Sequence, residues 1–194
     1  MTKRVGVLGG TFDPVHKGHL AISRSFLDSG LIDELWVIPA AIPPHKKGDE
    51  VTAYADRKAM LELVFGQWDK VRICTIEEQL PKPSYTLQTI KALKEAYPDH
   101  EFYLCLGSDS LVTFGQWYHY REILNECSLL VAKRPGFDDH QIEPEILEKT
   151  KFIDHNPVQV SSTELKEKMV GSNLPEEDLP EAVVQYIREK KLYL

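Results

Sequence analysis

One segment near the N-terminus gathers residue types that can hold a phosphate. Residues 9–19 read Gly-Gly-Thr-Phe-Asp-Pro-Val-His-Lys-Gly-His and follow a short apolar run. We expect the two glycines to let the backbone turn tightly and approach a ligand, and the helix behind them to offer unpaired N–H groups to an anion. His16 and His19 are three residues apart, and on a helix this spacing puts both imidazoles on one face. Gly18 between them removes a side chain that could block the anion.

Each part of this segment also has a plainer interpretation. A double glycine after a strand is usually only a turn, and this one lacks both the G-x-G-x-x-G pattern and the Lys-Ser/Thr of a P-loop. The two histidines could form an exposed helix end or half of a metal site, but the sequence offers no third ligand at a convincing spacing. The whole string at a strand-to-helix junction is more specific than its parts, so we favour phosphate binding.

The elements that must position this segment follow from an alternation of apolar runs and helical periods. Strands are predicted over residues 4–8, 34–38, 71–76, 101–106 and 128–132, and helices over residues 20–27, 54–65 and 86–96. Strands that are apolar almost throughout are typical of a parallel sheet buried on both faces. The β-α-β-α order therefore predicts an α/β fold, a doubly wound parallel sheet with helices on both faces.

The last third of the chain changes character after Pro135. A short helix and a weak strand at residues 152–153 are followed by two further helices, so that residues from about 160 to 194 form a helical C-terminal segment. Ser161 or Ser162 is a suitable N-cap for the first of these, which would run to about residue 170. We expect the part beyond Gly171 to serve in packing. Residues 39–49, with three prolines and two adjacent lysines, predict a surface loop after a strand, where ligand contacts are common.

Composition limits the class of protein. A chain of 194 residues with 42% apolar and 27% charged residues fits one globular domain spanning 1–194. The 23 basic and 30 acidic residues give a net charge of −7, which argues against binding to a long nucleic acid but allows a small anionic substrate. Three cysteines without a C-x-x-C pair disfavour disulfides and zinc thiolates and suit the cytoplasm. The sequence predicts neither a signal peptide nor a membrane span.

Two motifs carry a family resemblance. Residues 9–19 resemble the G-[TS]-F-D-P-x-H-x-G-H signature of nucleotidyltransferases related to class I aminoacyl-tRNA synthetases, a superfamily with a Rossmann-like fold. Residues 160–163, Val-Ser-Ser-Thr, resemble the start of its I-S-S-T-x-x-R motif. Within the superfamily, the chain is most similar to the bacterial nicotinate-nucleotide adenylyltransferase family over nearly its whole length. The further matching segments are residues 42–46, 56–57, 83–89, 106–110, 117–118 and 133–136.

This resemblance implies an activity and a set of site residues. The phosphate of nicotinate mononucleotide would attack the α-phosphorus of ATP, releasing pyrophosphate and forming deamido-NAD, with Mg²⁺ carried on ATP rather than held by the protein. The catalytic residues would be His16 and His19. The implied ATP-binding residues are Gly9, Gly10, Thr11, Phe12, Gly107, Asp109, Arg134, Ser162, Thr163 and Lys166. The implied residues for nicotinate mononucleotide are His45, Lys46, Tyr85, Thr86 and Trp117.

The residue types in the second group suit a flat ring with a carboxylate. Trp117 and Tyr85 offer aromatic walls, although packing in the core or at a rim is the commoner role of such residues. We expect the Tyr85-Thr86 turn and the backbone near Trp117 to offer only hydrogen-bond donors, which would favour the acid over the amide. Asp109 could equally be the N-cap of a helix after Gly107.

One position departs from the family pattern, and several alternatives stay open. Lys166 stands where the motif ends in arginine, which replaces a planar fork with a point charge. A sister enzyme, such as a phosphopantetheine adenylyltransferase or a cytidylyltransferase, would use the same chemistry. A non-catalytic nucleotide sensor and a metal-binding regulator built on His16 and His19 are alternatives from other classes. The oligomeric state is also open, with a homo-oligomer as one option.

Overall fold

The architecture is a doubly wound parallel sheet, as the sequence predicts. The computed structural model describes residues 2–42, 51–169 and 174–193. These residues form a six-stranded sheet in the order β3-β2-β1-β4-β5-β6, in which all neighbouring strands are parallel. The strands are β1 (Lys3–Gly10), β2 (Glu34–Pro39), β3 (Val71–Ile73), β4 (His100–Gly107), β5 (Ser128–Lys133) and β6 (Thr150–Asp154).

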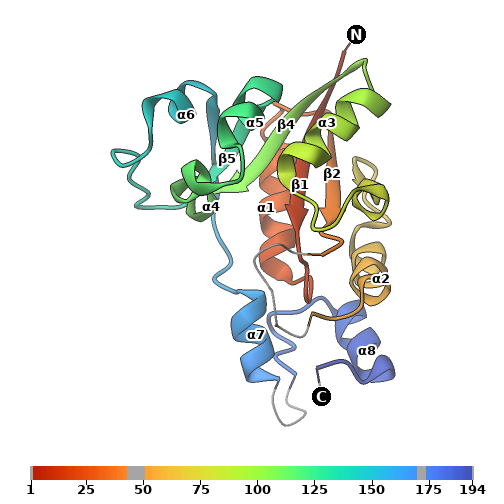
Figure 1. Ribbon diagram of the computed structural model, residues 1–194. Coiled ribbons are helices and arrows are strands. Elements are labelled where there is room, and N and C mark those ends of the chain that lie inside the picture. The colour runs from red at the N-terminus through yellow and green to blue at the C-terminus, as the bar shows by residue number, and fades with distance from the viewer. Residues whose placement is uncertain (1, 43–50, 170–173, 194) are drawn as a thin grey trace.

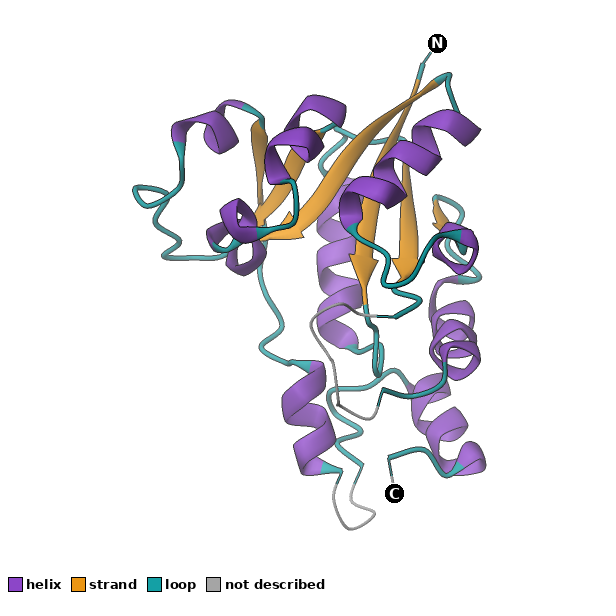
Figure 2. Ribbon diagram, viewed as in Figure 1, coloured by secondary structure: helices purple, strands orange, loops and turns teal. Residues whose placement is uncertain are grey.

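Helices cover both faces of this sheet (Figures 1 and 2). The α-helices are α1 (Lys17–Asp28), α2 (Tyr54–Phe65), α3 (Thr86–Ala96), α4 (Ser108–Val112), α5 (Tyr120–Glu126), α6 (Pro144–Glu148), α7 (Ser162–Lys168) and α8 (Glu181–Lys190). Two 3₁₀ turns, η1 (Ile76–Gln79) and η2 (Phe114–Gln116), precede α3 and α5. None of the helices in the described ranges combines the length and the apolar character that crossing a bilayer would require.

Two apolar cores lie on opposite faces of the sheet. Phe26 of α1, Met60 of α2 and Val183 of α8 belong to one core, and Ile90 of α3 and Ile123 of α5 belong to the other. Strand β1 contributes side chains to both cores, because successive side chains of a strand point to opposite faces of the sheet. The buried sheet thus gives a rigid frame whose strands all end at the same edge.

The switch in strand order places the candidate site. Strands β2 and β4 flank β1 on either side, so the chain leaves β1 and β4 in opposite directions at their carboxyl ends. In this fold, ligands bind in the crevice at such a switch point. Gly10 ends β1 and Gly107 ends β4, and α7 and α8 lie beyond the end of the sheet at which β1 finishes (Figure 1).

Most predicted elements are confirmed, and the differences have local causes. Helices α2 and α3 have the predicted bounds. The strand expected over residues 71–76 ends at Ile73, because β3 is an edge strand paired only with β2 and the chain then turns into η1. Helix α1 starts at Lys17, earlier than predicted, because His16 occupies the N-cap position. The weak strand at residues 152–153 is the centre of the longer β6.

Candidate active site

The segment after β1 does not turn at its glycines. Gly9 and Gly10 are the last residues of β1, and the left-handed backbone belongs to Phe12, with φ of 50°. A Cβ on Gly9 would meet open space, whereas one on Gly10 would lie 3.0 Å from the Phe12 ring. The expectation that the two glycines make the tight turn was therefore wrong. Gly9 leaves room beside the crevice, and Gly10 leaves room for a buried aromatic ring.

The two histidines meet as stacked rings. His16 is the extended N-cap of α1 and His19 lies in its first turn, so only His19 is helical. Their ring centroids are 3.8 Å apart, and the His19 ring also packs edge-on against Phe12. The backbone N–H of His16 donates to Nδ1 of His19 over 3.2 Å. Because Nδ1 accepts, the proton of a neutral His19 must be on Nε2, where it can be donated to a phosphate oxygen.

Burial keeps both histidines neutral near pH 7. Desolvation lowers the pKa of His16 to about 4, opposed by the negative charge of Asp178. The pKa of His19 is well below its ordinary value, because of desolvation and the neighbouring His16. Nδ1 of His16 is buried and has no hydrogen-bond partner among the described residues. A triphosphate bound here would supply the negative charge that a protonated histidine needs.

Gly18 serves the histidine pair in a different way from the one predicted. A Cβ at this position would lie 3.0 Å from the His16 ring and 3.1 Å from Val160. Its missing side chain therefore makes room for the His16 ring and for the segment before α7, rather than clearing a path for the anion. This space could not be recognised from residues 9–19, because Val160 is distant in the sequence.

The ends of β4 and β5 bring together the residues implied for adenosine. Gly107 is the N-cap of α4, and Asp109 is the second residue of that helix, so the expectation that Asp109 could be the N-cap was wrong. The exposed Arg134 follows β5, and its Nη2 lies 3.6 Å from Oδ2 of Asp109. A Cβ on Gly107 would collide with Oδ1 of Asp109. The residues implied for adenosine thus lie together, with both charged side chains exposed.

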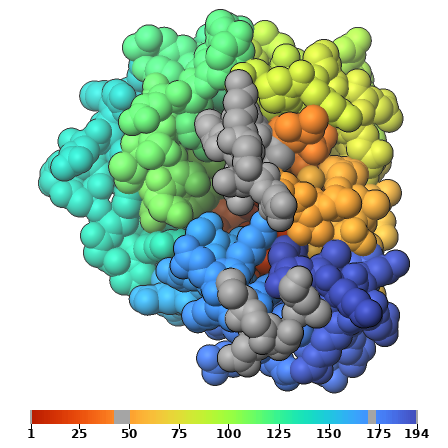
Figure 3. All heavy atoms as spheres, turned by 60° about the horizontal axis from the view of Figure 1, so that its bottom comes forward, coloured from red at the N-terminus to blue at the C-terminus, as the bar shows by residue number. Residues whose placement is uncertain are grey.

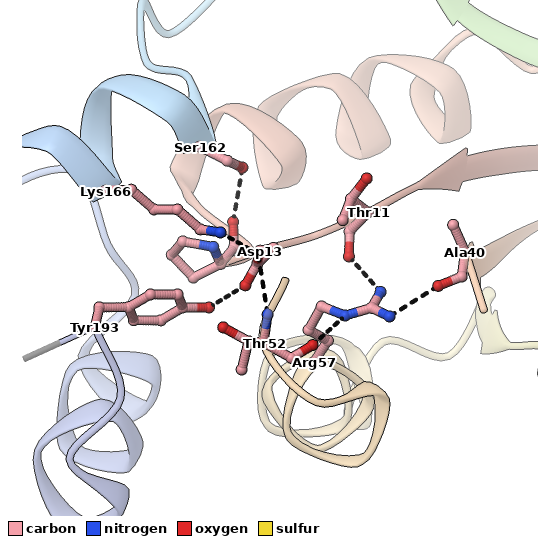
Figure 4. Close-up of polar contacts among 9 residues, drawn as sticks. Thr11, Asp13, Ala40, Thr52, Arg57, Ser162, Lys166 and Tyr193 are labelled. Atoms are coloured by element: carbon pink, nitrogen blue, oxygen red, sulfur yellow. Dashed lines mark hydrogen bonds and ion pairs between the residues drawn. The ribbon is translucent and has the colours of Figure 1, made fainter. Parts of the chain in front are cut away.

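Helix α7 packs against the histidine segment from far along the chain. Ser161 is its N-cap, and the Ser162 hydroxyl donates to the Pro14 carbonyl over 3.0 Å. Thr163 is exposed, and Lys166 forms an ion pair with the buried Asp13. The second motif therefore lies beside the first, with Lys166 directed at a carboxylate of the first motif (Figure 4).

Arg57 supports the same segment from α2. The residue is 1% exposed, and its guanidinium donates to the carbonyls of Thr11 (2.7 Å), Thr52 (2.9 Å) and Ala40 (2.9 Å). Burial lowers the pKa of Arg57, although nearby Asp13 raises it. This residue ties the ends of β1 and β2 together (Figure 4). Sequence reasoning matched it to the family but gave it no role, since a lone arginine on a helix is usually solvated.

A cavity of about 420 Å³ adjoins the end of β1. Gly9, Gly10 and Thr11 line one part of it, and Tyr85, Thr86 and Trp117 line another. Its remaining lining residues are Val7, Ile38, Ala40, Glu77, Ser84, Thr89, Ile90, Leu104, Leu106, Gln116, Tyr118 and Ile123. The ring of Tyr85 packs on that of Tyr118 at 4.5 Å between centroids. The aromatic residues predicted for a flat ring therefore share one cavity with the phosphate segment. His45 and Lys46 lie outside the described residues.

The lining of this cavity is not made of donors alone. The carboxylate of Glu77 borders it and accepts hydrogen bonds from Ser84 Oγ, Thr89 Oγ1 and the N–H of Ala41. The N–H of Tyr85 donates to Gln88 Oε1, and the N–H of Trp117 donates to the Phe114 carbonyl. The donor-only expectation was therefore wrong for the cavity as a whole. The N–H of Thr86, in the first turn of α3, has no acceptor within its helix.

The cavity lies at the carboxyl ends of the central strands, at one end of the sheet, since Gly10 of β1, Ile38 of β2 and Leu106 of β4 line it. Figure 3 looks onto that end and shows N-terminal residues, in red, at the floor of a hollow between the blue C-terminal helices and the green residues that follow β4. Crevices of this kind, beside a helix start and lined by aromatic residues and a few polar groups, are typical of nucleotide sites.

Comparisons with known proteins agree with this geometry. The cytidylyltransferase-like family matches residues 7–168, which together with the fold and the paired motifs defines a nucleotidyltransferase. A nicotinate-nucleotide adenylyltransferase of Bacillus subtilis is 33% identical, covering 98% of each chain. A probable nicotinate-nucleotide adenylyltransferase of Shewanella pealeana is 34% identical, over 98% of this chain and 95% of the relative. The chain belongs to the nicotinate-nucleotide adenylyltransferase family.

Solved structures share the fold. A nicotinic acid mononucleotide adenylyltransferase of Plasmodium falciparum complexed with APC superposes with a TM-score of 0.81 at 21% identity, covering 98% of this chain and 97% of the other. The same enzyme complexed with NaAD gives a TM-score of 0.80 at 22% identity, with the same coverage. At this level of identity the likeness supports the Rossmann-like architecture.

Proposed function

We propose that this chain transfers the adenylyl group of ATP to nicotinate mononucleotide, forming deamido-NAD and pyrophosphate in NAD biosynthesis. The observation that carries this proposal is the shared lining of one cavity by the phosphate segment and the aromatic residues. Gly9, Gly10 and Thr11 border the same space as Tyr85 and Trp117. A mononucleotide whose ring lies between the aromatic residues would direct its phosphate toward the end of β1, where the histidines are.

The chemistry needs positioning and charge stabilisation rather than a protein nucleophile. A phosphate oxygen of nicotinate mononucleotide forms the new bond to the α-phosphorus of ATP, and the bond from that phosphorus to the bridging oxygen of pyrophosphate breaks. Negative charge on the triphosphate would be met by His16, by Nε2–H of His19 and by the N–H of Gly18. The N–H groups of Lys17 and His19, on either side of Gly18, already donate to the carbonyls of Asp178 and His16. The residues Gly107, Asp109 and Arg134 would receive the adenosine.

Mg²⁺ fits this site as a partner of ATP. Two carboxylates near the crevice are already engaged within the protein, since Asp13 pairs with Lys166 and Glu77 accepts from Ser84 and Thr89. Mg²⁺ usually keeps several waters and binds substrate phosphates through few protein ligands. We therefore assign the ion to the triphosphate.

We place the reaction in the cytoplasm, where the buried free thiols of Cys74, Cys105 and Cys127 would stay reduced.

The test of this proposal compares acceptors in one assay. Pyrophosphate release from Mg·ATP is followed with nicotinate mononucleotide, with phosphopantetheine, and without an acceptor. We expect release only with nicotinate mononucleotide, and deamido-NAD as the co-product. Release only with phosphopantetheine would identify a sister enzyme instead. Thermal-shift measurements with ATP, nicotinate mononucleotide and Zn²⁺ separate the other classes: stabilisation by ATP without turnover would indicate a sensor, and stabilisation by Zn²⁺ alone a metal-binding regulator.

A further inference from the structure

The end of the chain reaches the catalytic segment. The hydroxyl of Tyr193 donates to Oδ1 of Asp13 over 2.6 Å, joining residues that are 180 positions apart. Asp13 is 0% exposed and lies three residues before His16. Figure 4 shows the Tyr193 side chain pointing at this carboxylate from the C-terminal segment. A segment expected only to pack is therefore in contact with the phosphate motif.

Asp13 is a junction between distant parts of the molecule. Its Oδ2 accepts from Lys166 of α7 and from the N–H of Thr52, which precedes α2. Burial alone would raise the pKa of Asp13, but the hydrogen bonds from Lys166, Thr52 and Tyr193 bring it below its ordinary value. A buried carboxylate is tolerated only when such donors surround it. The Lys166 ammonium also lies 5.6 Å from the centre of the Tyr193 ring.

The same C-terminal segment also contacts the chain directly after His16. The N–H of Lys17, directly after His16, donates to the Asp178 carbonyl over 3.0 Å, and Nζ of Lys17 donates to the Glu177 carbonyl. The C-terminal segment therefore contacts the chain both before and after His16. Packing alone requires apolar contacts, which Val183 and Ile187 already supply. These polar contacts are directed at the residues that fix the position of the imidazoles.

We propose that Tyr193 is a positioning residue for adenylyl transfer, which acts through Asp13 to hold the segment from Phe12 to His16 and the start of α1, where His19 lies. This proposal rests on the proposed function. Without the hydroxyl, Oδ1 of the fully buried carboxylate loses its donor, and Asp13 turns toward Lys166 and Thr52. Residues 12–16 follow that movement. A displacement of about 1 Å at a catalytic group can cost on the order of 10²-fold in rate.

The test compares Tyr193→Phe with a matched control, Tyr186→Phe. Tyr186 belongs to the same C-terminal segment and also donates its hydroxyl to a carboxylate, Asp56 Oδ1, over 2.8 Å. Each substitution removes one such bond and keeps the ring. We expect kcat to fall about tenfold or more in Tyr193→Phe and to stay near wild type in Tyr186→Phe, with little change in the KM for nicotinate mononucleotide in either. Equal kcat in the two folded variants would overturn the proposal.

Coupling shows whether Tyr193 acts through Asp13. In an Asp13→Ala background, Tyr193→Phe should change kcat by less than twofold, because position 13 then has no side-chain oxygen to accept from the hydroxyl. A tenfold loss in both backgrounds would overturn the route through Asp13. The melting temperatures of the single and double variants are compared as well, so that a loss of kcat caused by unfolding is recognised.

A spectroscopic readout separates this proposal from the proposed function. The ¹⁵N signals of the imidazoles report the protonated nitrogen of each histidine, here Nε2 of His19. We expect these signals to shift in Tyr193→Phe and not in Tyr186→Phe. If the wild-type protein forms no deamido-NAD but the shift occurs, the proposed function fails, and with it the role in adenylyl transfer, while the effect of Tyr193 on the position of the imidazoles stands. If the wild type is active and Tyr193→Phe changes neither the signals nor kcat, the positioning role is wrong.

Discussion

The phosphate side and the ring side of the crevice are built by different means. On the phosphate side, hydrogen bonds tie the end of β1 to α2, α7 and the C-terminal segment, through Arg57, Ser162, Lys166 and Tyr193. On the ring side, η1, α3 and η2 shape an aromatic cavity, and Glu77 joins the start of α3 to the end of β2. Stabilising the charge of a triphosphate requires hydrogen-bond donors held in fixed orientations, so that segment is anchored by hydrogen bonds from several elements. Binding a flat ring requires mainly an aromatic surface to pack against.

The largest effect should follow from cutting the phosphate side at Arg57. In Arg57→Met, the half-buried carbonyls of Thr11, Thr52 and Ala40 lose their donor, at about 1–3 kcal/mol each. We expect a loss of about 3 kcal/mol or more in the free energy of unfolding, measured by urea denaturation. Arg24→Met is the matched control, because the exposed Arg24 only stacks on Trp68 at 4.3 Å. Similar losses of unfolding free energy in the two variants would show that the hydrogen bonds of Arg57 do not stabilise the phosphate side of the crevice.

Replacing either histidine tests the chemistry of the same side. His16→Ala and His19→Ala should each lower kcat by roughly 10²-fold or more, the scale for removing a preorganised donor, while the fold persists. The exposed His140 provides the control, since His140→Ala should leave kcat unchanged. Near-normal kcat in a folded His19→Ala protein would remove His19 from the assignment.

Lys166 decides whether the second motif acts on ATP as well as on Asp13. If its ammonium also reaches the triphosphate, Lys166→Ala should weaken ATP binding about tenfold, the scale of one charged hydrogen bond. Lys166→Arg should bind ATP equally well or better. Lys168→Ala, on the same helix, is the control in the same calorimetric titration. Unchanged ATP affinity in Lys166→Ala would confine Lys166 to the structural ion pair.

The buried histidines should make stability depend on pH. The pKa of His16 is about 4 in the folded protein and ordinarily 6.5, so between these values the unfolded chain binds more protons. The contribution is complete above about pH 6.5 and is lost as the pH falls toward 4. Between pH 7 and 5.5 the loss from His16 should be about 1 kcal/mol. Thermal unfolding of wild type and His16→Gln over this range measures it, and identical pH profiles would refute the neutral buried imidazole.

The fold and the two motifs were predictable because their signals are local. Helices α2 and α3 have the predicted bounds, and in α3 the recurrence of Leu87, Ile90 and Leu93 every three residues marks its buried face. The capping serine of α7, Ser161, was one of the two candidates. The conformation of Phe12 was not predictable, because an aromatic residue at positive φ is uncommon. The turn was therefore assigned to the neighbouring glycines.

The residues that support the site from distant parts of the chain could not be predicted, for a different reason. The contact of Tyr193 with Asp13 joins residues 180 positions apart, and no periodicity or spacing records such a pair. Glu77 received no role from the sequence, yet the folded protein buries it, where it accepts from Thr89 of α3 and from the N–H of Ala41 after β2. Local patterns thus indicate which residues can take part in the chemistry. Long-range packing determines which other residues keep those side chains in position.

One comparison of substrates tests the central claim most directly. The wild-type protein is given Mg·ATP with either nicotinate or nicotinamide mononucleotide, and kcat/KM is measured for each. On the ring side, an oxygen of either substrate can accept from the Thr86 N–H, so discrimination depends on a second donor: a carboxylate accepts from both donors, whereas a carboxamide turns its NH₂ toward one of them and leaves two donors facing each other, at about 1–3 kcal/mol. Glu77 already accepts from Ser84 and Thr89. We expect kcat/KM to favour the acid by at least ~10-fold; equal values, or no deamido-NAD at all, would contradict the assignment.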